Sequence, residues 1–358
     1  MHLTVSLSLP SISNALASLH SRSNLVAVLV DLFSVDALEF GKKLNISSHV
    51  LFASSCINLS ILLYLPTLDE ILSSKKGDLS QPVKLPGLHN AEAIAMSTAE
   101  ELETEVLKTV PEINPNLPVF PVGPIIQAGS TTRASGPGSE CLEWLDRQPK
   151  NSVLYVCFGS GATLSFQQTT ELALGLEMSG HRFLWVVRPP SGSSISTYLS
   201  AQKDESDPLK FLPDGFVGRT KDRGFLVQSW CPQIDVMRHE STGGFLTHCG
   251  WSSTAESLVY GKPTIVWPLF ADQPVNAAML TDSLKVAIRP EADERDGIVR
   301  RGEVCRVVKC LLESEEGKGM YKRVQVIKDV VTTALGEKGS STKNIESLVV
   351  KWMKNSRA

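Results

Sequence analysis

The amino-acid sequence predicts an α/β protein with two domains, each built on a parallel sheet that helices cover. Short apolar runs rich in β-branched residues, such as 25–30 and 153–158, alternate with longer segments of helical periodicity. Continuous apolar runs are typical of strands buried on both faces of a sheet, and strand–helix alternation is typical of parallel sheets with right-handed crossovers. The length of 358 residues also suits two domains of ordinary size.

In the first half, the apolar spacing predicts a short parallel sheet with its crossover helices. Asp31 stands directly after the apolar run 25–30. Open α/β sheets place ligands at the carboxyl ends of their strands, which makes Asp31 a candidate site residue. A cap of the following turn is the simpler role, and position alone favours that cap. The predicted helices are 12–21, 35–43, 55–63 and 100–107, and the predicted strands are 25–30, 49–52 and 119–122.

A segment rich in Gly, Ser, Thr and Pro, residues 123–138, predicts a linker between the two domains. Beyond it, the run 153–158 leads into Gly159, Ser160 and Gly161 and then into a helical pattern. Glycines in a strand-to-helix turn let the backbone approach an anion, so Ser160 is a second candidate, although a plain tight turn explains them equally well. The predicted parts are a first domain over 1–124, a linker over 125–140, a second domain over 141–339 and a terminal helix over 340–358.

The second half continues the alternation of strands and helices. The polar, Ser-rich residues 191–210 predict a surface loop rather than a packed element. Residues 245–246 form a short apolar run after two glycines and predict a buried strand. The other predicted strands are 153–158, 183–187, 224–228 and 285–288, and the predicted helices are 141–146, 165–179, 274–283, 300–312, 320–335 and 342–354.

The composition excludes several classes of protein. Hydrophobic residues make up 42% and charged residues 20%, as in globular proteins, and the net charge of −3 gives no electrostatic footprint for nucleic acid. The longest apolar stretch, 50–65, contains polar residues and ends at Pro66, so a buried core helix is favoured over a membrane span. The seven scattered Cys form no Cys-x-x-Cys pair, which predicts no disulfide framework or zinc site and favours reduced thiols in the cytoplasm.

Strand 245–246 and the residues after it predict an anion site. A turn begins at His248, and Ser252 or Ser253 is the predicted N-cap of the next helix, with Glu256 at capping-box spacing from Ser253. A helix N-terminus carries free N–H groups and partial positive charge, so it can hold a diphosphate, and His248 adds a donor. Glu256, one turn into the helix, is placed to accept hydrogen bonds from ribose hydroxyls.

The flanks of this turn supply the remaining chemistry of a sugar nucleotide. Trp230 offers a flat aromatic face on which a base can stack. Asp272 and Gln273 form an acceptor–donor pair that suits sugar hydroxyls. Base, ribose, phosphate and sugar groups together indicate a nucleotide-sugar as the ligand.

Two other kinds of site fit this region poorly. A serine-hydrolase elbow needs a Gly two residues after the nucleophile, and residues 250–254 lack it. Cys231, His239, His248 and Cys249 are metal-ligating residue types, but their spacing matches no standard zinc pattern. We therefore expect no metal at this site.

The stretch from Trp230 to Gln273 resembles the signature segment of the plant family 1 UDP-dependent glycosyltransferases, including those that act on phenols. Its first Trp, its fourth-position Gln, its His-Cys-Gly-Trp core, its Glu and its final Asp-Gln fall in register without a gap. The resemblance implies a GT-B fold of two Rossmann-like domains with the N-terminal one incomplete, a UDP-sugar co-substrate and no cofactor. It also implies a set of donor-binding residues: Ser160, Trp230, Cys231, Gln233, His248, Trp251, Ser252, Ser253, Glu256, Asp272 and Gln273.

The sequence also departs from the pattern of this family. Ser252 stands where the family usually has Asn, which weakens an expected contact near the phosphates. The family's base is a His in a Gly-His-x-x-Pro-like setting, and Asp31 resembles the Asp that orients it, but this sequence has no such setting. By resemblance, the chain starts partway through the acceptor-binding domain and lacks several helices between 82–87 and 90–95.

Two hypotheses follow from the resemblance and its departures. The first is a monomeric cytoplasmic enzyme that transfers a sugar, most often glucose, from UDP-sugar to a hydroxyl of a phenolic or other lipophilic acceptor, with inversion. The second is a catalytically silent relative that only binds UDP-sugar, because loss of a general base alone costs roughly a hundredfold to ten-thousandfold in rate. Only the first hypothesis predicts product, whereas both predict donor binding.

Overall fold

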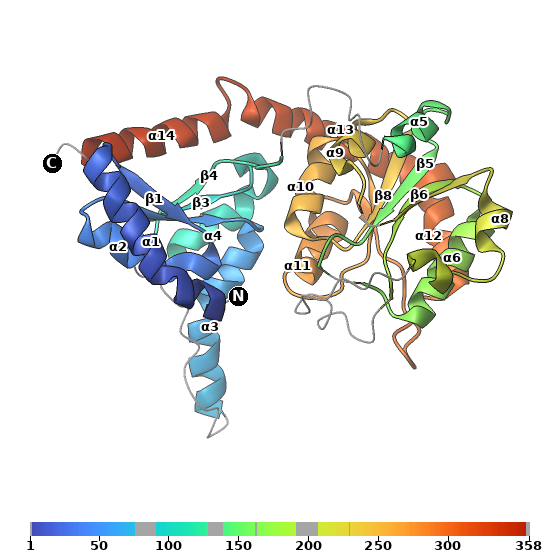
Figure 1. Ribbon diagram of the computed structural model, residues 1–358, viewed down its shortest axis with the longest axis horizontal. Coiled ribbons are helices and arrows are strands. Elements are labelled where there is room, and N and C mark those ends of the chain that lie inside the picture. The colour runs from blue at the N-terminus through green and yellow to red at the C-terminus, as the bar shows by residue number, and fades with distance from the viewer. Residues whose placement is uncertain are drawn as a thin grey trace. The chain divides into compact units, whose positions relative to one another are not determined.

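The computed structural model describes residues 2–75, 91–127, 139–161, 163–190, 207–228 and 230–355. The chain forms two compact units, the first Met1–Ile125 with Val330–Ala358 and the second Ile126–Asp329 (Figure 1). Contacts therefore assign 330–339 to the first unit, whereas the sequence analysis placed these residues in the second domain. Most of the predicted linker and of the 191–210 loop, and the break between 82–87 and 90–95, lie outside the described residues.

Unit 1 contains a parallel sheet in the order β1-β2-β3-β4, which confirms the predicted strand type. The core lies where apolar residues of β2 and β3 meet those of α2, α3 and α4. Its strands are β1 (Ala27–Val30), β2 (Ser47–Phe52), β3 (Ala93–Met96) and β4 (Val119–Pro121), and its helices are α1 (His2–Arg22), η1 (Leu32–Ala37), α2 (Leu38–Lys43), α3 (Cys56–Lys75), η3 (Glu100–Leu102), α4 (Thr104–Ile113) and α14 (Ser340–Asn355), with α13 (Glu315–Leu335) leading into the unit from unit 2.

Several features of unit 1 differ from the prediction. Helix α1 begins at His2 rather than at 12, and the expected helix over 100–107 is η3 followed by α4, which runs on to Ile113. The sequence analysis missed β3, because a four-residue strand that is half Ala shows little β pattern, and pairing with β2 and β4 on both sides decides its conformation. The expected helix over 35–43 is a 3₁₀ turn, η1, followed by the shorter α2. Helix α3 runs on to Lys75, well past the predicted end at 63.

The amino end of α3 is held by a carboxylate distant in sequence. Glu103 is buried, and its Oε1 accepts hydrogen bonds from the backbone N–H groups of Cys56 at 2.7 Å and Ile57 at 3.3 Å. These are donors that the first turn of a helix leaves unpaired. Burial raises the pKa of Glu103, opposed by the hydrogen bonds that it accepts. None of the described helices, α3 included, is long and apolar enough to cross a membrane.

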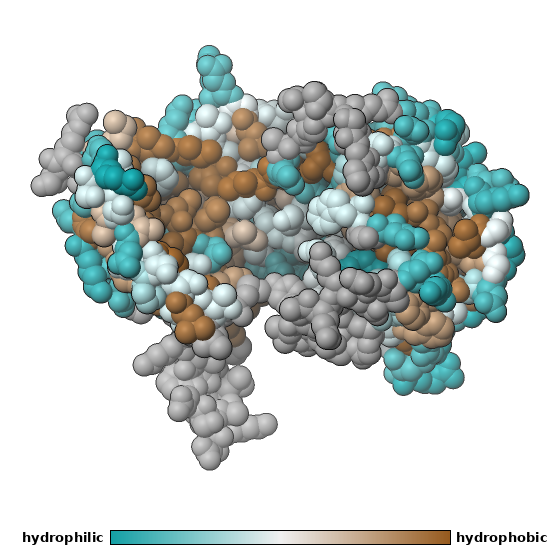
Figure 2. Space-filling model, in the orientation of Figure 1, coloured by the Kyte–Doolittle hydropathy of each residue, from teal (hydrophilic) through white to brown (hydrophobic). Residues whose placement is uncertain are grey.

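Helix α14 packs on one face of the unit 1 sheet and begins beside the carboxyl end of β4. Asn344 Nδ2 donates to the Pro121 carbonyl at 2.8 Å, and Ser341 Oγ donates to the Gly123 carbonyl at 2.6 Å. Leu348, 3% exposed, packs with Ala95 and Val122. Figure 2 shows hydrophobic residues gathered along this helix, and four of them are solvent-exposed: Ile345, Val349, Val350 and Met353.

Unit 2 contains a larger parallel sheet in the order β10-β9-β8-β5-β6-β7. Sequence patterns predicted the long strands of this sheet, but they missed β9 and the short helices α8 and α9, which are too short for periodicity to show. The strands are β5 (Val153–Cys157), β6 (Arg182–Val187), β7 (Gly224–Gln228), β8 (Thr242–Thr247), β9 (Thr264–Val266) and β10 (Ala287–Ile288).

Helices cover both faces of this sheet (Figure 1). Successive side chains of a strand point to opposite faces, and Leu154 and Val156 of β5 join one core cluster while Val153 and Tyr155 join the other. This explains why the strand is a continuous apolar run. The first cluster includes α6 (Phe166–Ser179), α8 (Phe216–Thr220) and α12 (Arg301–Glu313), and the second includes α5 (Glu140–Asp146) and α9 (Gln233–Arg238).

The strand order of unit 2 reverses between β5 and β8. From β5 the chain moves outward through β6 and β7, and it then returns to β8 on the other side of β5 before moving outward through β9 and β10. Such a switch point opens a crevice outside the carboxyl ends of the two central strands, where open α/β sheets bind ligands. The turns after β5 and β8 therefore mark the first place to look for a site.

We predict that Leu348→Ala weakens the docking of α14 in unit 1 by about 2–4 kcal/mol, because it removes a buried side chain and leaves a cavity. Hydrogen exchange of the α14 and β4 amides measures the free energy of local opening. The control is Val349→Ala, at a position 39% exposed, for which a change below about 0.5 kcal/mol is expected. Equal protection in both variants would contradict the assigned packing.

Candidate functional site

The turns after β5 and β8 lie close together at the switch point, and neither Gly159 nor Gly250 has room for a side chain. Gly159 has φ +71°, which favours glycine, and a Cβ at Gly159 would lie 2.6 Å from Cε1 of His248. A Cβ at Gly250 would lie 2.5 Å from His248 Nε2. The two glycines therefore let the imidazole lie between the turns, and Ser160, exposed, follows directly on the β5 side.

His248 is an uncharged hydrogen-bonding group at neutral pH. Burial lowers its pKa to about 4, opposed by the negative charge of Asp272. Its Nδ1 is buried and has no hydrogen-bond partner among the described residues. An uncharged imidazole has one donor and one acceptor nitrogen, so His248 can offer one N–H to a ligand.

The conformation of the β8–α10 turn is held by a residue that the sequence analysis missed. Cys249 has φ +65°, and its carbonyl accepts a hydrogen bond from Asn276 Nδ2 at 3.0 Å. The same Nδ2 donates to Asp272 Oδ2 at 3.0 Å, so Asn276 fixes the turn and one site carboxylate together. No local pattern connects Asn276 with Cys249, because 27 residues separate them.

Helix α10 (Trp251–Val259) begins earlier than predicted, and its N-cap is Gly250. The predicted cap at Ser252 or Ser253 is therefore wrong, and Glu256 does not close a capping box. Gly250 has an extended ψ of 146° and no side chain, so the first N–H groups of α10 receive no capping oxygen from it. Ser252 is exposed at this end of the helix and Ser253 is buried.

Glu256 pairs instead with α9. Gln233 Nε2 donates to Glu256 Oε2 at 2.5 Å and approaches Ser253 Oγ at 3.4 Å. Gln233 Oε1 in turn accepts a hydrogen bond from the Tyr155 hydroxyl at 3.0 Å. Burial raises the pKa of the Glu256 carboxyl, opposed by the hydrogen bond from Gln233. Gln233 and Glu256, two of the predicted donor-binding residues, are thus in direct contact, and Tyr155 is a partner that the sequence analysis missed.

Trp230, Trp251 and Cys231 differ in solvent exposure. Trp230 is 71% exposed, so its indole face is free to stack. Trp251 and Cys231 are buried, and the Cys231 sulfur lies 3.1 Å from the Tyr155 hydroxyl. These two predicted site residues can therefore offer a ligand only their backbone, while their side chains support the framework.

Asp272 and Gln273 stand at the start of α11 (Gln273–Ala278). The Gln273 side-chain oxygen accepts hydrogen bonds from the backbone N–H groups of Leu269 at 2.8 Å and Phe270 at 3.0 Å. This leaves the Gln273 amide nitrogen as the group that can donate to a ligand. Asp272 supplies a carboxylate beside it, so the predicted acceptor–donor pair exists as neighbours.

Arg188 is a further charged residue that the sequence analysis missed. It directly follows β6, and its Nη1 donates to the Gly159 carbonyl at 3.1 Å. The guanidinium thereby supports the β5–α6 turn from the neighbouring strand. A charged residue directly after a buried strand is the same signal that singled out Asp31, and it was available in the sequence.

Asp31 lies in unit 1, at the carboxyl end of β1. It is the N-cap of η1, and its Oδ1 accepts a hydrogen bond from the Phe33 N–H at 2.9 Å. The simpler role that the sequence favoured, a turn cap, is therefore the one that the structure gives. A catalytic role for Asp31 remains a prediction.

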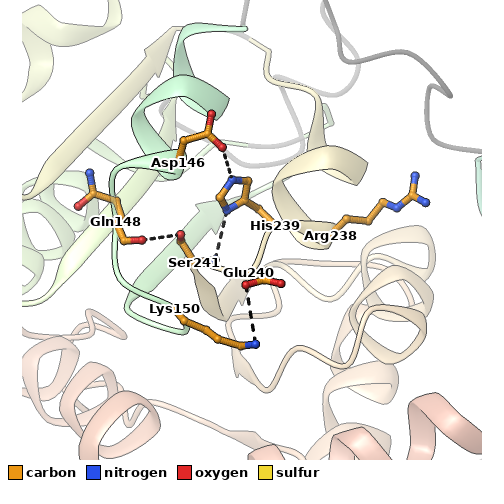
Figure 3. Close-up of a pocket in the computed structure, with 7 residues that line it drawn as sticks. All are labelled: Asp146, Gln148, Lys150, Arg238, His239, Glu240 and Ser241. Atoms are coloured by element: carbon orange, nitrogen blue, oxygen red, sulfur yellow. Dashed lines mark hydrogen bonds and ion pairs between the residues drawn. The ribbon is translucent and has the colours of Figure 1, made fainter.

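A cavity of about 420 Å³ opens elsewhere in unit 2, beside the amino ends of β5 and β8 (Figure 3). Two pairs of its lining groups are in contact: His239 Nε2 lies 3.1 Å from Asp146 Oδ1, and Lys150 Nζ lies 3.8 Å from Glu240 Oε2. It is at the end of the strands opposite to His248, so it belongs to no part of the predicted site. The residues described contain no cluster of three metal-ligating side chains either.

The fold defines a class: a protein of two parallel-sheet units, the second of which has a topological switch point between β5 and β8. Comparison with known proteins then gives the family. The family model for UDP-glucoronosyl and UDP-glucosyl transferases matches residues 42–289. The chain belongs to this family, which confirms both the resemblance and the GT-B type of fold.

Individual relatives agree with the family model. UDP-glycosyltransferase 72B1 of Arabidopsis thaliana is 43% identical over 98% of this chain and 79% of its own length. Hydroquinone glucosyltransferase of Rauvolfia serpentina is 42% identical over 98% of this chain and 80% of its own length. The solved structure of Phytolacca americana UGT2 with UDP-2fluoro-glucose and pterostilbene matches with a TM-score of 0.85 at 42% identity, over 99% of this chain and 82% of that chain.

We predict that His248 makes stability depend on pH. Its pKa is about 4 in the folded protein and about 6.5 in the unfolded chain, so the unfolded chain takes up the proton first as pH falls. The uncharged His248 thereby contributes about 3 kcal/mol to the free energy of unfolding. This contribution is fully present above about pH 6.5 and is lost as the pH falls towards 4. Urea unfolding between pH 7.5 and 4.5 measures it, and His248→Phe should flatten this part of the profile. Parallel profiles for wild type and variant would contradict it.

Proposed function

We propose that this chain transfers a sugar, most readily glucose, from a UDP-sugar to a hydroxyl of a small phenolic or other lipophilic acceptor, with inversion at the anomeric carbon. The family supports the UDP-sugar donor. The names of the relatives support the finer assignment, since one is a hydroquinone glucosyltransferase and a similar solved structure holds UDP-2fluoro-glucose. In this proposal UDP-sugar is a co-substrate, the protein acts without a cofactor or metal, and it works as a cytoplasmic monomer.

The observation that carries the proposal is the meeting of two turns at the β5/β8 switch point. The uncharged His248 and the uncapped start of α10 place N–H donors at one point of unit 2. A diphosphate is the part of the donor that such an arrangement suits, because helix N-terminal N–H groups and the helix dipole favour an anion. Ser160 and Ser252, both exposed beside these turns, add hydroxyl donors.

The remaining donor groups are assigned by their hydrogen-bonding chemistry and, for Trp230 alone, by exposure, since Glu256 and Gln273 are 7% and 4% exposed. Trp230 stacks on the uracil, since its indole is exposed. Glu256, held by Gln233, accepts hydrogen bonds from the ribose. Asp272 and the Gln273 amide nitrogen bind hydroxyls of the transferred sugar. The buried residues Trp251, Cys231 and Ser253 complete the donor set through backbone or framework contacts.

The chemistry divides between departure of UDP and activation of the acceptor. Negative charge builds on the diphosphate as the sugar–phosphate bond breaks, and preorganised N–H donors stabilise that charge without reorganising. The acceptor hydroxyl must lose its proton to a base as it attacks. The sequence has no His in the setting of the family's base, so in this proposal the Asp31 carboxylate, at the carboxyl end of β1, is the group of unit 1 that accepts this proton.

Titration calorimetry with UDP tests the donor site. His248→Ala should lower UDP affinity about tenfold or more, because it removes a hydrogen bond to a charged group. The double variant with Glu256→Ala should abolish measurable binding. Product formation from UDP-glucose and hydroquinone then measures turnover separately from binding.

A glycine pair sharpens this test. Gly250→Ala should lower UDP affinity roughly threefold to tenfold, because a new Cβ 2.5 Å from His248 Nε2 displaces the ring. Gly302→Ala, where an added Cβ meets nothing within 4 Å, is the matched control and should leave affinity within about twofold. Wild-type protein that binds no UDP would overturn the proposed donor site. Binding without product would overturn the transferase activity alone.

Asp31→Ser separates the cap from a catalytic role. Serine keeps a side-chain oxygen that can accept from the Phe33 N–H, so stability should change by less than about 0.5 kcal/mol. Loss of the carboxylate should lower kcat at least about tenfold while UDP affinity stays constant. Steady-state kinetics and urea unfolding give the two readouts. Unchanged kcat would show that Asp31 is only a turn cap.

A further inference from the structure

Tyr155 is a buried polar side chain at the centre of the unit 2 sheet, below the proposed donor site. It lies on β5, is fully buried, and its ring stacks on Phe245 of β8 with centroids 4.9 Å apart and planes 17° apart. Its hydroxyl is the only part of this side chain that can form hydrogen bonds, and burial without partners would be costly. The orientation of the Tyr155 hydroxyl therefore affects the side chains with which it forms hydrogen bonds.

The Tyr155 hydroxyl begins a chain of hydrogen bonds that ends at Glu256. It donates to Gln233 Oε1 at 3.0 Å, and Gln233 Nε2 donates to Glu256 Oε2 at 2.5 Å. The Cys231 sulfur lies 3.1 Å from the same hydroxyl. These groups come from β5, the segment before α9, α9 and α10, so the chain links four parts of unit 2.

The Gln233 amide has its oxygen towards Tyr155 and its nitrogen towards Glu256. Burial raises the pKa of Tyr155 well above its ordinary value, so the hydroxyl keeps its proton and acts as a donor. A donor on that side requires the amide oxygen there, and the amide nitrogen then faces Glu256. A hydrogen bond from this nitrogen favours the ionised carboxylate, which accepts hydrogen bonds but cannot donate them.

We propose that Tyr155 is a positioning residue for nucleotide recognition: it orients the Gln233 amide and thereby holds the Glu256 carboxylate as an acceptor for the ribose hydroxyls. This inference rests on the proposed donor site and adds a selectivity to it. A carboxylate positioned to accept hydrogen bonds from the ribose hydroxyls loses one of those bonds when the ligand lacks the 2′-hydroxyl. Unit 2 therefore distinguishes ribonucleotides from 2′-deoxyribonucleotides, and Tyr155 is a source of that distinction.

The test compares UDP with 2′-deoxy-UDP as ligands in titration calorimetry at pH 7.5. Wild-type protein should bind UDP roughly tenfold more tightly. Tyr155→Phe keeps the ring and its stack on Phe245 and removes only the hydroxyl. This variant should lose roughly threefold to tenfold in UDP affinity and less than about twofold in 2′-deoxy-UDP affinity, so the preference largely disappears.

Tyr260→Phe is the matched control, because Tyr260 packs against the same core cluster as Tyr155. It should keep the wild-type ratio of the two affinities. If Tyr155→Phe weakens both ligands equally, Tyr155 is structural and the proposal is overturned. The proposal is overturned as well if neither affinity changes.

A second variant tests the proposal if Tyr155→Phe does not fold. Gln233→Met preserves much of the side-chain volume and removes the amide that transmits the orientation. It should reproduce the loss of preference between UDP and 2′-deoxy-UDP, and a retained preference would overturn the inference. If wild-type protein binds neither ligand, the donor site itself fails, whereas a wild type that binds both ligands with equal affinity leaves the site intact and overturns only the role of Tyr155.

Discussion

The close approach of the turns after β5 and β8 is the constraint on which the rest of the site depends. The strand order reverses between these strands, so their carboxyl ends open onto one crevice. The His248 ring fills the space beside Gly159 and Gly250, and neither position accommodates a Cβ without moving it. Glycine at these two positions thus decides where the imidazole lies. Arg188 and Asn276 stabilise the two turns by hydrogen bonds to the carbonyls of Gly159 and Cys249.

The electrostatics of the site follow from burial. His248 is uncharged at neutral pH because burial lowers its pKa, and Arg188 already donates to the Gly159 carbonyl. Beside the charged groups Arg188 and Asp272, the crevice gathers dipoles, namely the start of α10, an imidazole and hydroxyls. Oriented dipoles suit a diphosphate whose charge rises during sugar transfer, since they need not reorganise as it does.

The proposed donor set separates into exposed side chains and buried side chains that support them. Trp230 is largely exposed, whereas the side chains of Trp251 and Cys231 are buried in the framework. Gln233 also supports another side chain, because its amide bonds Tyr155 on one side and Glu256 on the other. The signature segment from Trp230 to Gln273 contains residues of both groups, although their physical roles differ.

The sequence by itself determined the parallel α/β class, most long strands and helices, and the stretch that carries the site, because apolar periodicity and local turn residues report burial and turns directly. It did not determine β3 and β9, which are too short to show a period and form through their neighbours. It also misplaced the cap of α10, since Glu256 is bonded to Gln233 rather than to its own helix. The partnership of Tyr155 with Gln233, 78 residues apart, was decided only by the tertiary structure, because hydrogen bonds between distant strands and helices leave no mark on local pattern.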